Sequence, residues 1–209
     1  MKRIRHHLNR IFLLFVLFFA AALVVPSDVP ASGGTILAQA ATSKATVAKK
    51  ANSIISSVVE EEDTALEQLE KLFVYAEKKW GYSRSTTTIT SLGTARTFAY
   101  SIYKNKAGSC YHFAAGYAYL ARQALGSSKK YTVRIAVGQT NGFGNGLQAH
   151  AWVEIKINGT WYVFDPNLDK FAENSSLKYY MAKRSKSSVK KVYNKYKNVK
   201  YYTMAYKKI

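Results

Sequence analysis

The first half of the chain carries two amphipathic helix patterns. Apolar residues recur near the 3.6-residue helical period at Leu66, Leu69, Phe73, Ala76 and Trp80. Asp63 is the expected N-cap of this helix, and Gly81 its expected end. The same period runs through Ala95, Phe98, Ala99 and Ile102 and predicts a second helix in the segment 94–108.

A third helix is expected to be buried, because the segment "GSCYHFAAGYAYLARQALG" is rich in alanine and has few charges. It should begin at Ser109 or Cys110 and end at Gly126. One stripe of this helix contains Cys110, Phe113, Ala114, Tyr117 and Ala121.

The pattern changes to β-rich runs after the third helix. The run 131–139 has the composition and length of a strand. Asn158-Gly159 then separates two more such runs and predicts a type I′ hairpin, whose two central residues need positive φ. Helices followed by antiparallel strands indicate an α+β fold in which the Cys110 helix packs on the sheet. The glycine-containing loop 140–149 lacks the lysine of a phosphate loop and is expected to form a flexible rim.

A two-residue turn also predicts the register of this hairpin, with Ile157 opposite Thr160. His150, Trp152, Val163 and Asp165 then share one face of the sheet. His150 and Asp165 become diagonal neighbours, about 7–8 Å apart at Cα. Glu154 lies on that face but about 13 Å from His150. The core should lie on the opposite face, which holds Val153, Ile155, Ile157, Tyr162 and Phe164.

These positions suggest a nucleophile, a base and an orienting acid. Backbone N–H groups at a helix start favour the thiolate of Cys110 and can hold an oxyanion. His112 is about 200° around the helix from Cys110, which leaves His150 to exchange the thiol proton and Asp165 to orient the ring. Each residue taken alone has a plainer explanation: a buried thiol, a hydrogen-bonded histidine, a strand end. Taken together, they favour catalysis.

The amino end has the features of an export signal. A basic leader and 15 apolar residues precede the small residues "AQA", so residues 1–40 are expected to be a cleaved signal peptide. Cleavage near Ala31 or an uncleaved anchor remains open. Residues 41–50 are expected to form a flexible mature N-terminus, followed by one domain over 51–209. In its tail, 174–209, tyrosines should pack on the core from a last helix and strand while lysines face water.

Net charge and cysteine content limit the partners and cross-links expected of this protein. The chain carries +19 at pH 7, and +16 without residues 1–40, so anionic cell-wall or membrane-surface polymers are expected partners. The tyrosine- and lysine-rich tail could also hold nucleic acid, but charge alone predicts no specific nucleic-acid partner. A single cysteine, Cys110, excludes an internal disulfide.

The segments around Cys110, the run "HAWVEI" and the run "WYVFDPN" together resemble the bacterial transglutaminase-like superfamily over roughly 63–168. The resemblance implies a papain-like α+β core with Cys110 as nucleophile, His150 as general base and Asp165 as orienting carboxylate. The superfamily often has Pro-Thr after its aspartate, where this chain has Pro166 and Asn167. No upstream residue can be matched to the oxyanion site. The chain also lacks an acidic cluster like the calcium sites of animal members, so no metal or cofactor is expected.

These features predict an exported, cysteine-dependent acyltransferase or hydrolase that acts on protein or peptide amide bonds at the cell envelope. The alternative is an inactive envelope-binding module that keeps the fold and the charge.

Overall fold

The computed structural model describes residues 42–144, 146–171, 179–183 and 196–209. The expected signal peptide, 1–40, lies outside the described residues. The part of the tail expected to form the last helix lies outside them as well, because residues 184–195 are not described.

The first helix, α1, spans Lys44–Ile55 and begins with Ser43 as its N-cap. Val47 and Ala51 are fully buried in the core. Residues 44–50 of the segment 41–50, which is expected to be flexible, are helical in this structure. Small and basic residues had suggested a flexible end, but Ala and Lys are good helix formers and Val47 and Ala51 lie on one face, four residues apart.

Helix α2 spans Ala65–Lys79 and buries Leu69, Phe73 and Ala76 as expected. Its N-cap is Thr64, one position after the expected Asp63, and Glu67 completes a capping box with it. Asp63 instead accepts the N–H of Glu60 and pairs with Lys71. Leu66 is 39% exposed and so lies outside the buried stripe.

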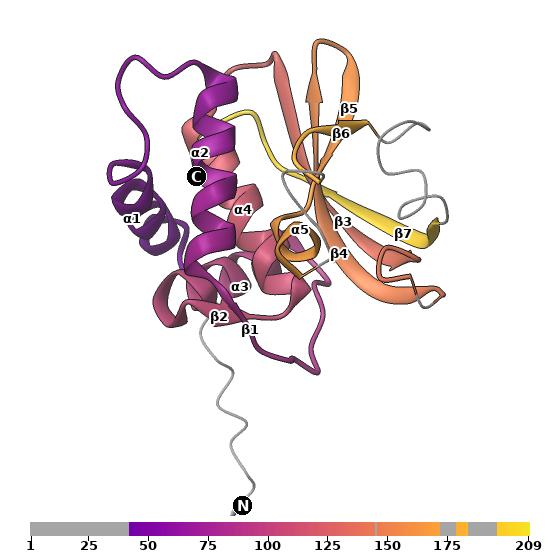
Figure 1. Cartoon of the computed structure of the whole chain (residues 1–209). Coiled ribbons are helices and arrows are strands. Elements are labelled where there is room, and N and C mark those ends of the chain that lie inside the picture. Colours follow the sequence, from indigo (N-terminus) through magenta and orange to yellow (C-terminus); the bar gives the residue numbers. More distant parts are fainter. Residues whose placement is uncertain (1–41, 145, 172–178, 184–195) are drawn as a thin grey trace, which may run out of the picture. The chain divides into compact units, whose positions relative to one another are not determined.

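Helix α3, Leu92–Asn105, and helix α4, Cys110–Ala124, are joined by a short link that contains β2, Ala107–Gly108. β2 pairs in parallel with β1, Gly81–Tyr82, which follows α2. α4 begins at Cys110 and ends before Gly126, as expected. It is the central helix, in contact with α1, α2, α3 and α5 and with two strands of the main sheet (Figure 1).

The main sheet has five strands in the order β6-β5-β4-β3-β7, and all its pairs are antiparallel. The strands span Tyr131–Thr140 (β3), Gln148–Ile157 (β4), Thr160–Phe164 (β5), Ala182–Lys183 (β6) and Tyr196–Thr203 (β7). The helices α1 to α4 lie on one side of this sheet in Figure 1. The fold is therefore α+β, with the Cys110 helix packed on an antiparallel sheet.

The hairpin of β4 and β5 has the expected register, with Ile157 opposite Thr160 and Ile155 opposite Tyr162. Asn158 and Gly159 both have positive φ, 48° and 84°, as a type I′ turn requires. Beyond the hairpin, β5 ends at Phe164 and the helix α5, Pro166–Phe171, begins at once.

Apolar side chains pack on both faces of the sheet. Val153, Ile155 and Phe164 join the core with the helices, as the alternation predicts. Trp152 and Val163 lie on the other face, in a second cluster with Leu168 and Tyr179. The face that holds His150 is thus covered, and its polar groups are removed from water.

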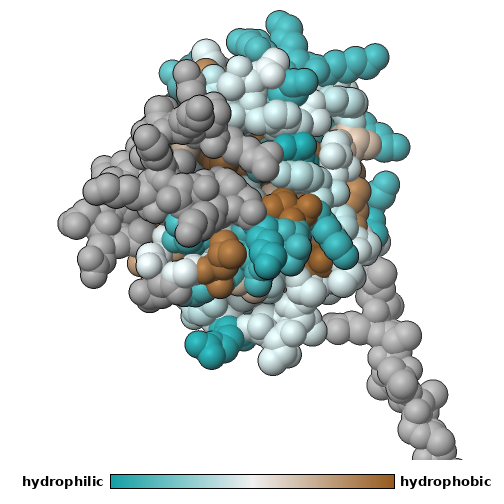
Figure 2. Space-filling model, turned by 90° about the vertical axis from the view of Figure 1, so that its right-hand side faces the viewer, coloured by the Kyte–Doolittle hydropathy of each residue, from teal (hydrophilic) through white to brown (hydrophobic). Residues whose placement is uncertain are grey.

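The described end of the tail confirms the expected strand, β7, which pairs with β3. Tyr202 is partly buried against the core, whereas Tyr201 is 36% exposed. Figure 2 views this side of the molecule, where small apolar patches lie between hydrophilic side chains on the described surface. Within the described ranges, no helix is long and apolar enough to cross a membrane.

Candidate active site

Cys110 is the first residue of α4 and is 7% exposed. The N–H groups in the first turn of a helix lack the usual acceptor four residues earlier. At the start of α4, the N–H of His112 donates instead to the Ser109 carbonyl at 2.9 Å. The thiol is free and has no second cysteine with which to pair. A buried thiol at this position can act as a nucleophile only if a base lies next to it.

His112, the other histidine near the thiol, is used at the start of α4. Its Nδ1 accepts the backbone N–H of Ser109 at 3.2 Å and lies 3.1 Å from the Ser109 hydroxyl. Its ring packs on Phe98, and burial lowers the pKa of His112. These contacts engage His112 at the start of α4. They agree with the expectation that His112 is not the base for the Cys110 thiol.

His150 and Asp165 form a buried pair. His150 Nε2 lies 2.5 Å from Asp165 Oδ2, and the two side chains are 0% and 1% exposed. The other carboxylate oxygen, Oδ1, accepts the N–H of Leu168 at 2.9 Å, so Asp165 also caps α5, which begins with Pro166. The cap leaves Oδ2 for the imidazole and thereby sets the position of the ring.

Nδ1 of His150 is buried and makes no well-formed hydrogen bond with the described residues. The Cys110 sulfur nevertheless interacts with the ring. Burial lowers the pKa of His150, but the charge and hydrogen bond of Asp165, with smaller contributions of both kinds from Cys110, outweigh burial and raise that pKa well above its ordinary value. The imidazolium is therefore the favoured form near neutral pH, and it can form an ion pair with an anionic sulfur.

Cys110 and His150 open on one cavity of about 460 Å³. Its wall includes side chains from β1, the β3–β4 loop, β4 and α5, namely Tyr82, Phe143, Gln148, Ala149, Asn167 and Phe171. Phe143 lies edge-on to the His150 ring at 5.0 Å, and Tyr82 packs against Phe171 at 5.9 Å. The three expected residues are thus brought together, with Asp165 behind His150.

The fold and the order of these residues invite comparison with known proteins. A family model described as the Transglutaminase-like superfamily matches residues 52–166, more than half of the chain. The chain belongs to this superfamily.

Other comparisons add less. A solved structure titled "Crystal structure of a TGase" is 12% identical to this transglutaminase-like chain, with a TM-score of 0.48. The match covers 67% of this chain and 36% of that one, so this chain corresponds to about a third of the solved protein. No curated protein sequence matches this chain significantly.

The face behind His150 holds a further chain of contacts. Trp152 stacks on His150 with ring centroids 6.1 Å apart and donates to Glu154 at 3.0 Å. Glu154 is 0% exposed and binds Arg134, whose guanidinium also lies over the rings of Trp161 and Tyr201. This pairing accounts for a buried acid, which is thereby engaged away from the catalytic candidates.

Several wall residues were not anticipated from the sequence. Alternation along β4 already placed Trp152 beside His150, so its contact could have been foreseen. Tyr82, Phe143 and Phe171 come from a two-residue strand, a loop and the end of a short helix, and no periodic pattern marks such positions. Asn167 was noted in the sequence only as a departure from the superfamily.

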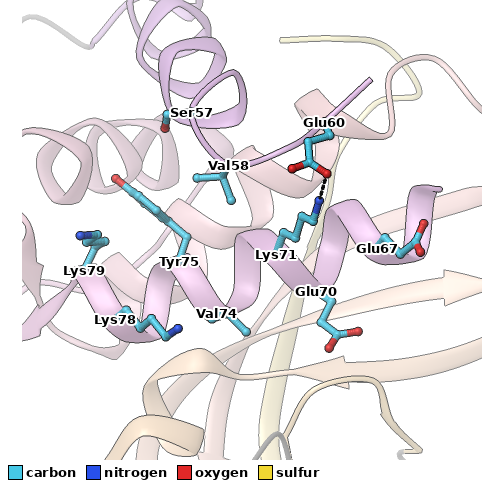
Figure 3. Close-up of a pocket in the computed structure, with 10 residues that line it drawn as sticks. All are labelled: Ser57, Val58, Glu60, Glu67, Glu70, Lys71, Val74, Tyr75, Lys78 and Lys79. Carbon is cyan, nitrogen blue, oxygen red and sulfur yellow. Dashed lines mark hydrogen bonds and ion pairs between the residues drawn. The ribbon is translucent and has the colours of Figure 1, made fainter. Parts of the chain in front are cut away.

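A larger cavity, of about 550 Å³, lies between α2 and the segment that follows α1 (Figure 3). Lys71 lines this cavity and pairs with Glu60 at 2.9 Å, and Val58 and Tyr75 are also part of its lining. Its lining residues include no cysteine or histidine. Size alone therefore does not identify the chemical site, and the smaller cavity beside Cys110 is the better candidate.

Proposed function

We propose that this protein is a cysteine-dependent acyltransferase or hydrolase that acts on amide bonds of proteins or peptides. The observation that carries the proposal is the buried His150–Asp165 pair, which opens on the same cavity as a thiol at a helix start. This arrangement supports a Cys-His-Asp triad, in which a thiolate and an imidazolium form from two neutral groups.

In the proposed first step, the Cys110 sulfur attacks the carbonyl carbon of a carboxamide or peptide bond. The carbonyl π electrons move to oxygen as the S–C bond forms. When the carbonyl re-forms, the C–N bond breaks, and the His150 imidazolium gives its proton to the departing nitrogen. Asp165 stabilises the charged ring throughout. The products are a thioester on Cys110 and ammonia or an amine.

In the second step, water or a primary amine attacks the thioester while neutral His150 takes its proton. As the carbonyl re-forms, the C–S bond breaks and the sulfur leaves as a thiolate beside the His150 imidazolium. Water releases an acid and makes the protein a hydrolase, whereas an amine forms a new amide and makes it a transferase. Among the described residues, the wall of the cavity carries aromatic side chains and, apart from His150, no titratable cation or carboxylate. An uncharged acyl donor with an apolar neighbour therefore fits this wall best.

Mass spectrometry tests the proposal on the purified full-length chain. Wild type, Cys110→Ala and Cys110→Ser are incubated with glutamine-containing peptides that have phenylalanine or glutamate beside the glutamine, with and without a primary amine. We expect wild type alone to give a product that has gained the amine and lost ammonia, or hydrolysis, and to favour the phenylalanine peptide. The same products from Cys110→Ala would rule out the proposed nucleophile.

The alternative, an inactive module that binds the envelope, follows from the net charge of +19. The two proposals differ in the role of the sulfur. Under the alternative, Cys110→Ala has no effect on any activity, and iodoacetamide labels Cys110 no faster than free cysteine. Under the catalytic proposal, labelling is fast at pH 6, and His150→Ala slows it at that pH by about tenfold or more because the imidazolium no longer stabilises the thiolate.

We further propose that this chemistry takes place outside the cell membrane, after export directed by residues 1–40. Amino-terminal sequencing of protein recovered from cell-envelope and medium fractions tests this location. A new terminus near Ala41 or Ala31 is expected, and a purely intracellular protein that retains Met1 would contradict it.

A further inference from the structure

Asn167 is a buried amide with an unused donor in the wall of the Cys110 cavity. The side chain is 2% exposed, and its Nδ2 makes no hydrogen bond within the described parts of the chain. The only other atom of this kind in that wall is Nδ1 of His150, among the residues described. The His150 ring interacts with the Cys110 sulfur, whereas Nδ2 of Asn167 has no partner among the described residues.

α5 holds Asn167 firmly in place. The helix starts with Pro166 at its first position, is capped by Asp165, and buries Leu168 in the second apolar cluster. Asn167 therefore follows, by two residues, the carboxylate that orients His150. A buried amide donor without a partner is destabilising, and a catalytic role or a bound water or ion is among the explanations for one in a native protein.

We propose that Asn167 donates from Nδ2 to the carbonyl oxygen of the acyl donor while that oxygen carries negative charge. This inference rests on the proposed function, because the oxygen becomes anionic only if Cys110 attacks the carbonyl carbon. The charge forms as the S–C bond forms, and it disappears when the carbonyl re-forms and the C–N bond breaks. Backbone N–H groups at the start of α4 supply the remaining donors to this oxygen. The side-chain donor, Asn167, comes after Asp165 in the sequence.

The chemistry of two thiol reagents separates oxyanion stabilisation from simple thiol reactivity. p-Nitrophenyl acetate acylates a thiolate through a tetrahedral oxyanion, whereas iodoacetamide alkylates it by direct displacement at carbon and forms no oxyanion. In the full-length chain we expect Asn167→Ala to slow acylation of Cys110 by about 100-fold or more. Alkylation should stay within about twofold of wild type, because the thiolate and imidazolium are unchanged.

Two further variants sharpen this test. Asn167→Asp has the same shape but places an acceptor and a charge opposite the oxyanion, so it should slow acylation at least as much as Asn167→Ala. Asn105→Ala removes an exposed amide from the end of α3 and should leave both reactions unchanged. Thermal melting of each variant checks that the fold is retained.

The outcomes distinguish this inference from the proposed function. Unchanged acylation in Asn167→Ala overturns the role of Asn167 and leaves Cys110 catalysis intact. An equal fall in acylation and alkylation also overturns it, because Asn167 then positions the thiol rather than the oxyanion. If wild-type Cys110 reacts with both reagents no faster than free cysteine, the proposed function fails, and this inference fails with it.

Discussion

Asp165 has two structural roles at the residue scale. One oxygen caps α5 through Leu168, and the other binds His150. An aspartate before a proline commonly marks the end of a strand. Here the same aspartate also supplies the His150 ring with its charged partner. The two roles can be separated, because an amide retains an oxygen for the cap but has no charge.

We predict that Asp165→Asn lowers the pKa of His150 below its ordinary value of 6.5. In wild type the carboxylate outweighs burial, and in the variant burial, which favours the neutral ring, prevails. NMR titration of the ring protons measures the change, with His112 as internal reference. A His150 ring that stays charged at neutral pH in the variant would contradict the assigned cause.

The raised pKa also has a consequence for stability. The contribution of His150 to the folding free energy is fully present below its ordinary pKa and is lost as pH rises through the raised value. Wild type should therefore lose stability from pH 6.5 upward, and Asp165→Asn should not show that loss.

Gly108 determines how closely the chain passes His112 before α4. A Cβ atom at Gly108 would lie 2.4 Å from the His112 Cβ atom, too close for any side chain. We predict that Gly108→Ala lowers the free energy of unfolding by about 1–3 kcal/mol and slows labelling of Cys110, which is two residues away. Chemical denaturation and iodoacetamide labelling measure the two effects.

Gly93→Ala is the matched control for this substitution, because its nearest neighbour, the Ser91 hydroxyl oxygen, would lie 3.4 Å from the new atom. It should change stability little. The loss caused by Gly108→Ala should be smaller in a His112→Gly background, which lacks the clashing Cβ atom, and an equal loss in both backgrounds would mean that the clash is not with His112.

At the scale of elements, α5 is the short helix that joins the site to the rest of the fold. It contacts α2 and α4, and Lys170 donates to the Trp80 carbonyl at 2.7 Å. Asp169, 1% exposed, accepts the N–H of Tyr179 and also lies beside Glu77 of α2. Burial, together with the hydrogen bond and charge of Asp169, raises the pKa of Glu77 from 4.5 to about 8.

We predict that stability falls between pH 4.5 and about 8 as Glu77 ionises next to Asp169. The folded protein binds the Glu77 proton more tightly than the unfolded chain does, because folding raises the pKa of Glu77. The contribution of Glu77 to the free energy of unfolding is therefore complete below pH 4.5 and is lost as pH rises to about 8. Glu77→Gln keeps a donor toward Asp169 and cannot ionise, so its stability should vary less over this range.

Urea denaturation at several pH values compares Glu77→Gln with wild type and with Glu70→Gln, an exposed position on the same helix. The difference between Glu77→Gln and wild type should grow with pH, while Glu70→Gln should follow wild type. If the difference in stability between Glu77→Gln and wild type stayed constant with pH, Glu77 would not be the group that binds a proton in this range.

At the scale of the whole molecule, the chain is strongly positive, whereas the candidate site has few charged groups. The chain has 31 basic and 12 acidic residues, whereas the described residues that line the cavity beside Cys110 are uncharged apart from His150. Hydrophilic side chains cover much of the described surface in Figure 2. Charge should therefore bring the protein to an anionic surface without selecting the bond that reacts.

We predict that the full-length chain binds anionic polymers at low salt and that its affinity falls by at least about tenfold between 50 and 300 mM salt. Cys110→Ala should bind equally well, because the thiol carries no part of this interaction. Sedimentation with anionic cell-wall polymer measures it, and binding that survives high salt would indicate a specific receptor site instead.

Local rules in the sequence determined the helices α2 and α4, the β4–β5 turn and its register, and hence the shared face of His150 and Asp165. Those rules act over a few residues, through helix period, capping, positive φ and strand alternation. At 44–50 small and basic residues favour a flexible segment, yet these residues are helical and Val47 is buried in the core.

Only the tertiary structure brought Cys110 to His150, because nothing in the local pattern specifies how the start of α4 meets β4. It also placed Tyr82, Phe143, Asn167 and Phe171 around one cavity, although they lie on three separate segments: β1, the β3–β4 loop and α5. Contacts between residues far apart in sequence depend on packing of the whole core, whereas register and capping depend on neighbours. The sequence by itself thus determined the candidate residues, and the packed fold decided their arrangement around the thiol.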